Sequence, residues 1–384
     1  MQRRQFLSRI SQASVLAAAP AFVTRAWAQE GINAKTITIG SSGALSGPLG
    51  AYGVNLKTGV DAAMAQINAK GGIHGRTLQF QMVDDAYAPA RTLENVKKMA
   101  ADGGVFALMS CIGTPNNAAI MPLVDELNLP YVAPLSGASS LRKNTSRNIF
   151  HVRASYTEEA QRLADRLVGM GIGNIAIVYL DNPFGKEVLA DTQRALAVKG
   201  VKAIAEVALA ADGKNLDAAV AQLIAAKPAA VVLGTAGAAS TGLVAAIKKI
   251  SPLMPIAGLS VALTSDGIAQ LGAAAAGIAI TMVFPDANRA KFAVVRDYQA
   301  AMRAAGKAEF ASGSLESYIN TMVLAEGLQR AGREVSRASL RNALAGLRNF
   351  DLGGFSLDYS AAPYVGSKFV ELGVLASGGR FVSY

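Results

Sequence analysis

The sequence predicts an α/β protein built from two doubly wound parallel-sheet lobes, and three observations support this prediction. Short segments rich in β-branched residues alternate with amphipathic helical segments from Thr36 onward. The alternation is interrupted near Val152 and then starts again. Residues 29–384 are 356 in number, more than a single hydrophobic core usually supports. Alternation at this spacing favours parallel βαβ units with right-handed crossovers.

The first 28 residues have the features of an export signal, so we exclude them from the fold. A basic start precedes a mildly apolar run at 10–23, and Ala26-Trp27-Ala28 is a small-x-small cleavage signal. The run is too short and too alanine-rich for a membrane span, so the mature protein is expected not to be membrane-spanning. The Arg3-Arg4 pair resembles a twin-arginine export signal, with a general secretory signal as the alternative. We expect cleavage near Ala28.

Charge and the scarcity of reactive residues exclude several classes of function. Lys and Arg outnumber Asp and Glu by 37 to 27, but four arginines and no acids fall within residues 1–28, so the net charge drops from +10 to +6 without them. The remaining basic residues form only short pairs, whereas nucleic-acid binding favours a clustered basic stripe. Cys111 is the single cysteine, and His74 and His151 are the only histidines. Neither an internal disulfide nor a Cys- or His-rich metal site is therefore expected.

The segment up to residue 152 supplies the first lobe in this prediction. Its expected strands are apolar and rich in β-branched residues, and they lie near 37–41, 77–83, 105–109 and 131–133. Helices are expected between them, near 52–69, 89–102 and 116–128. The first strand, helix and second strand form one βαβ unit. Its Gly- and Pro-containing loop opens at the carboxyl edge of the sheet, where such sheets bind ligands.

The segment after residue 152 repeats the alternation and supplies the second lobe. Strands are expected near 175–180, 202–208, 229–233, 256–257 and 278–283. Helices are expected near 157–170, 184–199, 215–226 and 240–250. Residues 289–345 have a helical pattern with breaks at Gly306, Gly313 and Gly332, and residues 353–358 and 368–381 are expected to be terminal strands. These late elements indicate that the chain crosses between the lobes more than once.

The most specific motifs lie in the first βαβ unit. Leu45-Ser46-Gly47-Pro48 is followed by Tyr52-Gly53, and the turn before the second strand is Asn68-Ala69-Lys70-Gly71-Gly72-Ile73. These motifs resemble those of the branched-chain amino-acid-binding family, the type I periplasmic solute-binding proteins of ABC transporters, and weaker similarity continues nearly to the C-terminus. The resemblance implies a periplasmic protein that captures a small solute between its lobes by hinge closure and presents it to the membrane permease subunits.

The resemblance also implies that a hinge of three segments joins the lobes. We place the crossings near 153–155, 283–285 and 364–368. The first lobe then consists of residues 29–152 and 284–365, and the second lobe of residues 153–283 and 366–384.

Two loops of the first lobe form the predicted carboxylate-binding site. Thr114 has the properties of an N-cap and Pro115 those of a first helical residue. Free backbone N–H groups and the helix dipole favour a carboxylate there, with a purely structural cap as the alternative. The resemblance implies ligand contacts from the amide of Gly113, the hydroxyl of Thr114, and the carbonyl, hydroxyl and amide of Leu135, Ser136 and Gly137. It also implies that Ser46 and Tyr52 line this side.

The second lobe is predicted to supply the opposite wall. Tyr156 and Phe184 are candidate aromatic contacts, with a core position as the alternative for Phe184. Ala236 and Ser260 occupy positions where amino-acid-binding members usually carry an aromatic and an acidic residue, so the counter-ion of an α-ammonium group is missing unless Asp181 supplies it. We predict a small carboxylate without a free α-amino group, aromatic acids included. A branched-chain or other amino acid is the alternative.

No residue pattern indicates catalysis. An enzyme would need a base and a nucleophile converging on the cleft, and two histidines and one cysteine give little material for that. No cofactor, metal or catalytic residue is predicted, and Asp84-Asp85 is interpreted as a strand-end turn at the cleft rim. The chain is therefore predicted to be a transport protein and not an enzyme. A periplasmic ligand sensor of the same fold is the alternative, distinguished from it only by its partner.

Overall fold

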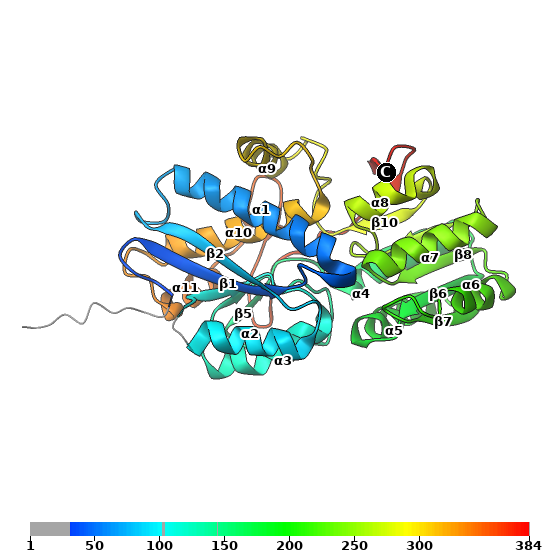
Figure 1. The fold of residues 1–384 in the computed structure, drawn as a ribbon, viewed down its shortest axis with the longest axis horizontal. Coiled ribbons are helices and arrows are strands. Elements are labelled where there is room, and N and C mark those ends of the chain that lie inside the picture. The colour runs from blue at the N-terminus through cyan, green and yellow to red at the C-terminus, as the bar shows by residue number, and fades with distance from the viewer. Residues whose placement is uncertain (1–30, 102–103, 144, 384) are drawn as a thin grey trace, which may run out of the picture.

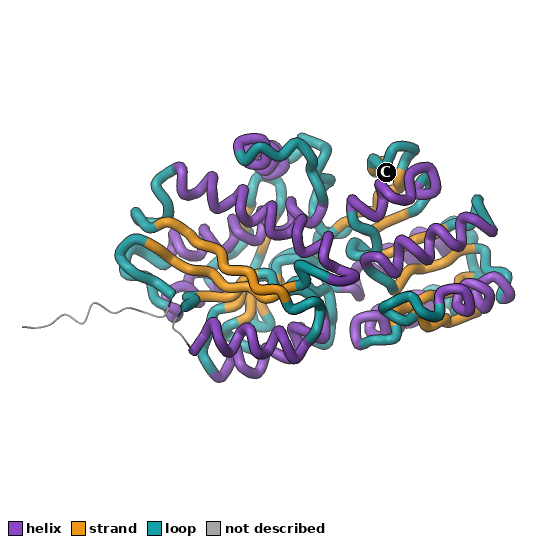
Figure 2. Tube along the Cα trace, in the orientation of Figure 1, coloured by secondary structure: helices purple, strands orange, loops and turns teal. Residues whose placement is uncertain are grey.

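The computed structural model describes residues 31–383 except 102–103 and 144, so the predicted export signal lies outside the described residues. The chain forms two lobes side by side, each with a central sheet and helices on both faces (Figures 1 and 2). Within the described part of the chain, no helix combines the length and apolar character needed to cross a bilayer.

The first lobe contains a six-stranded, wholly parallel sheet with the strand order β13-β5-β4-β3-β1-β2. Its inner strands are buried, as expected for a parallel sheet covered on both faces. The strands are β1 (Thr36–Gly43), β2 (Thr77–Asp84), β3 (Ala107–Met109), β4 (Tyr131–Val132), β5 (Ile149–His151) and β13 (Tyr364–Val365).

Helices from two distant parts of the sequence cover this sheet. They are α1 (Gly50–Ala69), α2 (Pro89–Ala101), α3 (Thr114–Glu126), α9 (Ala293–Ala304), α10 (Ser312–Arg330) and α11 (Arg337–Ala345), with short 3₁₀ segments η1 (Gly47–Leu49) and η2 (Leu141–Lys143) and a hairpin of β11 (Phe350–Asp351) and β12 (Ser356–Leu357). Helices α1 and α10 lie in close contact at Gly59, where a Cβ atom would fall 2.0 Å from the carbonyl oxygen of Ser314. A glycine is therefore required there.

The second lobe contains a seven-stranded sheet with the order β15-β14-β10-β9-β8-β6-β7. Five strands are parallel: β6 (Ile175–Leu180), β7 (Ala205–Leu209), β8 (Ala230–Gly234), β9 (Ile256–Gly258) and β10 (Ala279–Met282). Strand β14 (Glu371–Leu375) pairs antiparallel with β10 on one side and with β15 (Phe381–Ser383) on the other. Its helices are α4 (Tyr156–Gly169), α5 (Pro183–Val198), α6 (Leu216–Ala225), α7 (Gly237–Ile250), α8 (Ser265–Leu271) and the 3₁₀ segment η3 (Gly272–Ala275).

The chain passes from one sheet to the other three times, after β5, after β10 and after β13. The two-lobed α/β fold predicted from the sequence is thus confirmed, with two antiparallel strands added to the second sheet. The lobe limits at residues 152, 283 and 365 stay predictions.

Two local predictions were wrong. The predicted break at Gly313 is absent, because α10 begins at Ser312 and continues through Gly313, which lies beside the ring of Tyr52. Helix α8 was not predicted, although its start is typical: the side chain of Thr264 accepts a hydrogen bond from the Gly267 amide at 3.1 Å.

Candidate ligand-binding site

The loops after β3 and β4 are joined at the carboxyl edge of the first sheet. Gly113, at φ +102°, is the residue that flanks α3, so the prediction of Thr114 as the N-cap was wrong by one position. The Thr114 hydroxyl is instead hydrogen-bonded to the Ser136 hydroxyl at 2.8 Å, and both residues are buried. Two hydroxyl groups and the N-terminus of α3 therefore converge at this edge.

Two of the predicted backbone contacts pair with each other in the structure. The Gly113 amide donates to the Leu135 carbonyl at 3.1 Å, and the Leu135 amide donates to the Cys111 carbonyl at 3.0 Å. The Gly113 amide is thus already used in a hydrogen bond within the protein and is not available to a ligand. The Leu135 carbonyl oxygen retains a second lone pair that can accept a hydrogen bond from a ligand. Gly137 accepts from the Tyr156 amide at 2.7 Å, and a Cβ atom on Gly137 would fall 2.4 Å from the Tyr156 ring. Gly137 therefore permits the close approach of that ring.

A buried arginine that the sequence did not single out lies under the second loop. Arg142 donates to the carbonyl oxygens of Ser136, Ala138, Arg153 and Ala154 at 3.0–3.3 Å. Burial, and after it the charge of Arg153, lower the pKa of Arg142 to about 10, so it remains cationic at neutral pH. Its hydrogen-bond partners are neutral carbonyl oxygens and not a carboxylate, so its charge is not neutralised. The field at this loop therefore favours an anion.

Seven predicted residues from both lobes line a cavity of about 30 Å³, roughly the volume of one water molecule. The rings of Tyr156 and Phe184 meet edge to face there, with centroids 5.5 Å apart. Phe184 belongs to the first turn of α5, whose start is capped by Asn182 through the Gly185 amide at 2.9 Å. The seven are Tyr52, Gly113, Thr114, Leu135, Tyr156, Phe184 and Ala236.

The lobes also touch across the cleft at Ser140 and at Gly237. The Ser140 amide and hydroxyl donate to the Glu187 carboxylate at 2.7 and 2.6 Å. Gly237, at the start of α7, packs against η1 so closely that a Cβ atom would fall 2.6 Å from the Pro48 carbonyl oxygen. The structure therefore has the lobes closed on each other.

A second cavity of about 430 Å³ lies between the lobes, and it shares Tyr52 and Thr264 with the small one. Its volume is within the range of small-molecule sites. The first lobe contributes polar groups of Asn55, Ser312 and Glu316 and the ring of Phe310, and the second lobe contributes Ser260, Ile268 and Arg380.

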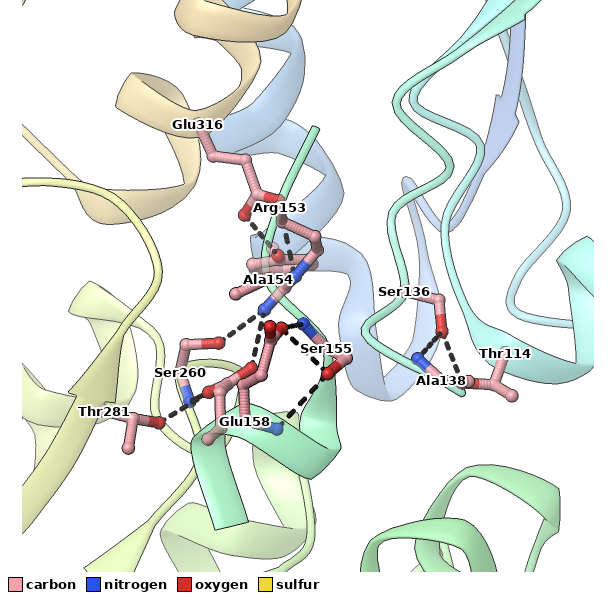
Figure 3. A network of polar contacts seen from close by, with 12 residues as sticks. Thr114, Ser136, Ala138, Arg153, Ala154, Ser155, Glu158, Ser260, Thr281 and Glu316 are labelled. Atoms are coloured by element: carbon pink, nitrogen blue, oxygen red, sulfur yellow. Dashed lines mark hydrogen bonds and ion pairs between the residues drawn. The ribbon is translucent and has the colours of Figure 1, made fainter. Parts of the chain in front are cut away.

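Arg153 links the two lobes through a network of polar contacts (Figure 3). Its guanidinium lies 3.3 Å from Glu316 of α10 and 3.4 Å from Glu159 of α4, and it donates to the Ser260 hydroxyl. Burial acts to lower the pKa of Arg153, but Glu316, Tyr156 and Glu159 hold it above the ordinary value. Ser260, predicted to face the ligand, is thus also part of this charged network.

Four predicted site residues line neither cavity: the buried loop residues Ser136 and Gly137, and Ser46 and Asp181. Ser46 is exposed, and its hydroxyl donates to Asp84 at 2.6 Å, a bond that contributes most to lowering the pKa of Asp84 to about 2. The side chain of Asp181 is 57% exposed and pairs with Lys186 at 2.8 Å. Asp181 therefore does not bring a counter-ion to the cleft in this structure. The carboxylate that faces the larger cavity is Glu316, which the sequence analysis missed.

The interpretation of Asp84-Asp85 as a turn agrees with the structure. Asp84 accepts the Leu45 and Ala86 amides at 2.8 and 3.0 Å, and Asp85 accepts the Ser42 hydroxyl at 2.9 Å. Asp84 therefore holds the first loop in place, and Asp85 holds the end of β1.

Comparison with known proteins identifies the family. The sequence model of the family described as periplasmic binding protein matches residues 36–363. The chain belongs to this family. The periplasmic binding protein described here is 29% identical over 187 residues to the Leu/Ile/Val-binding protein BraC3 of Rhizobium johnstonii, an alignment that covers 47% of this chain and 50% of the relative. The chain spans about half the length of the curated relatives that it matches.

Solved structures extend the similarity over nearly the whole chain. An extracellular ligand-binding receptor from Verminephrobacter eiseniae is 30% identical, with a TM-score of 0.85 over 90% of this chain and 99% of that one. A substrate-binding periplasmic protein from Ralstonia solanacearum is 29% identical, with a TM-score of 0.84 over 91% of this chain and 100% of that one. The family and the type I fold predicted for this periplasmic binding protein are therefore confirmed.

Proposed function

We propose that this periplasmic binding protein is the solute receptor of an ABC importer. It captures a small carboxylate between its lobes in the periplasm, closes by hinge motion and delivers the solute to the membrane permease. The observation that carries this proposal is the convergence of the Thr114 and Ser136 hydroxyls, the N-terminus of α3 and the buried charge of Arg142 on one edge of the cleft. Together they favour a carboxylate there.

The wall that the described residues of the second lobe contribute is suited to an apolar part of the ligand and has no feature that indicates catalysis. Tyr156 and Phe184 present aromatic surface, and Ala236 adds a small apolar contact. Among the described residues that line the two cavities there is no histidine or cysteine. The available hydroxyls, amides and carboxylates are suited to binding.

An amino acid is the second candidate ligand, because the curated relatives are named as Leu/Ile/Val-binding proteins. Its ammonium group would need an acidic partner, since a buried unpaired cation costs several kcal/mol. A periplasmic sensor would use the same cleft and differ only in its partner.

Native mass spectrometry of the exported protein, purified without added solute, tests the proposal directly. A retained small carboxylate is expected. A thermal-shift screen of benzoates, phenylpropanoids and short keto acids against amino acids then identifies the class. Stabilisation by leucine or valine alone would transfer the proposal to the second candidate, and stabilisation by no member of either set would contradict both.

A further inference from the structure

The cleft contains one buried carboxylate that the protein satisfies incompletely. The side chain of Glu316 is 7% exposed and lines the 430 Å³ cavity. One of its oxygens lies 3.3 Å from the Arg153 guanidinium, and the other accepts from the Tyr52 hydroxyl at 3.4 Å. Both distances are longer than those of strong charge-assisted hydrogen bonds. Burial raises the pKa of Glu316 while Arg153 acts to lower it, so a further donor would stabilise the charged form.

Glu159 provides a contrast within the same network. It accepts the Ser260 amide at 2.7 Å and the Thr281 hydroxyl in addition to Arg153, and it lines neither cavity. Arg153 therefore shares one positive charge between two carboxylates. Only the less well bonded of the two, Glu316, faces open space.

The two ends of the cleft consequently differ in charge. At the small cavity, Arg142 and the start of α3 favour an anion, whereas the larger cavity is lined by the Glu316 carboxylate. Tyr52 and Thr264 border both cavities, so the two cavities adjoin at these residues. Arg380 also lines the larger cavity, but it is exposed, where solvent screens its charge.

We propose that Glu316 determines ligand specificity by accepting a hydrogen bond from a hydroxyl or ammonium group at the end of the ligand remote from its carboxylate. The substrate class is then a small carboxylate with a distal hydrogen-bond donor, extended enough to pass Tyr52 into the 430 Å³ cavity. This inference rests on the proposed function, because it takes the carboxylate as bound by the first-lobe loops.

Matched ligand pairs test the proposal by calorimetry. One pair is 3-phenylpropanoate and 3-(4-hydroxyphenyl)propanoate, and the other is pentanoate and 5-aminopentanoate. In the wild-type protein, the donor-bearing member of at least one pair is expected to bind about tenfold more tightly, as for a hydrogen bond to a charged group. Glu316→Gln is expected to reduce this ratio to about threefold or less.

Glu159→Gln is the control, because it makes the same charge change beside Arg153 without altering the cavity wall. It is expected to preserve the ratio. A shift in the hinge equilibrium scales both affinities equally, so the ratio within one variant isolates the contact. If Glu159→Gln does not fold, Glu316→Asp serves instead and should give an intermediate ratio.

The outcomes separate this proposal from the function on which it rests. Equal affinities within both pairs, or an unchanged ratio in Glu316→Gln, overturn the role of Glu316 and leave carboxylate binding intact. Failure of the wild-type protein to bind any of the four probes or any carboxylate of the thermal-shift screen overturns the carboxylate function, and this inference with it.

Discussion

Arg142 and Arg153 are both buried, and the protein accommodates their charges in different ways. Arg142 donates to four backbone carbonyl oxygens, whereas Arg153 lies between two carboxylates. Carbonyl oxygens accept from both terminal nitrogens of the Arg142 guanidinium but do not neutralise its charge, and its buried Nε has no hydrogen-bond partner in the described part of the chain. The net positive field therefore lies at the Ser136 loop and not at the hinge, and this difference orients an anionic ligand toward the first lobe.

Thr114→Val tests the carboxylate contact at the loop after β3. The substitution removes the hydroxyl and nearly preserves the volume, so we expect the affinity for the carboxylate identified by the screen to fall about tenfold to a hundredfold, as for the loss of a hydrogen bond to a charged group. Isothermal titration calorimetry measures the change. Ser139→Ala is the control, because it removes a hydroxyl from the neighbouring loop after β4, and this hydroxyl bonds Thr157 and lines neither cavity. Equal affinities in Thr114→Val and wild type would refute the contact.

His151 should make the stability of the protein depend on pH. It is fully buried in β5, its Nδ1 atom has no hydrogen-bond partner, and burial, with Arg142 adding to it, lowers its pKa well below the ordinary 6.5. The unfolded chain binds a proton on this residue below pH 6.5 and the folded protein does not, so the contribution to stability is complete above that pH and is lost as the pH falls.

The expected loss attributable to His151 between pH 7.5 and 5.5 is about 1.4 kcal/mol. Urea unfolding at these two pH values measures it. Between pH 7.5 and 5.5, the free energy of unfolding of His151→Phe should fall by about 1.4 kcal/mol less than that of the wild type. Because Nδ1 has no hydrogen-bond partner among the described residues, replacing this nitrogen by carbon breaks no hydrogen bond. A pH dependence identical to wild type would exclude His151 as its source.

At the scale of elements, the sequence predicted strands and helices well where apolar periodicity was continuous. The strand at 175–180 and the helix starting at residue 89 match the structure at those limits. The Gly313 break failed because a glycine in the first turn of α10 does not end the helix, although helix propensity penalises glycine. Helix α8 is only 7 residues long, too short to show a helical period.

The sequence predicted those site residues that follow a strand, but not those whose position depends on a contact between residues distant in the sequence. Thr114 and Ser136 follow β3 and β4 directly, so their convergence follows from the parallel order of the strands. Glu316 and Arg153 are separated by 163 positions, and no local pattern indicates their contact. The structure shows that α10 is buried at eight successive positions, 314–321, but half of these residues or more are polar, so nothing in the sequence indicated that Glu316 is buried.

The contact between η1 and α7 makes a prediction about lobe closure. Gly237 has φ +61°, and its Cβ in Gly237→Ala would fall 2.6 Å from the Pro48 carbonyl, so the variant should favour an open cleft. Solution scattering is expected to give a larger radius of gyration than for wild type with ligand present, and ligand affinity should fall. Gly200→Ala is the matched control, because its φ is +72° but nothing lies within 4 Å of the added methyl group. Identical scattering from the two variants would rule out this contact as a determinant of closure.

For the whole molecule, ligand binding should stabilise the folded state and close the lobes. A ligand at about 100 times its Kd adds roughly 2.7 kcal/mol, since the unfolded chain has no cleft. Thermal melts should rise with ligand concentration, and the radius of gyration should decrease on binding. A confirmed ligand that leaves the radius unchanged would argue against hinge closure.

Export makes a separate prediction for the whole chain. The exported protein is expected to begin at or near Gln29, which intact-mass analysis determines. Arg3→Lys combined with Arg4→Lys should abolish export if the twin-arginine assignment is correct. Undiminished export of this double variant would point to the general secretory route and leave the location unchanged.

The three passages of the chain between the sheets have a consequence for how the molecule forms. Strand β5 gains its outer neighbour from β13, and β10 gains one from β14, so each sheet is completed by a segment made long after its first strands. A ribosome that has synthesised only 300 residues has therefore produced two unfinished sheets with open edges and no finished lobe. Contacts this distant in sequence also slow folding. We therefore expect the two lobes to complete their folding late and in one cooperative step. A prematurely terminated chain is expected to aggregate and not to form a folded lobe.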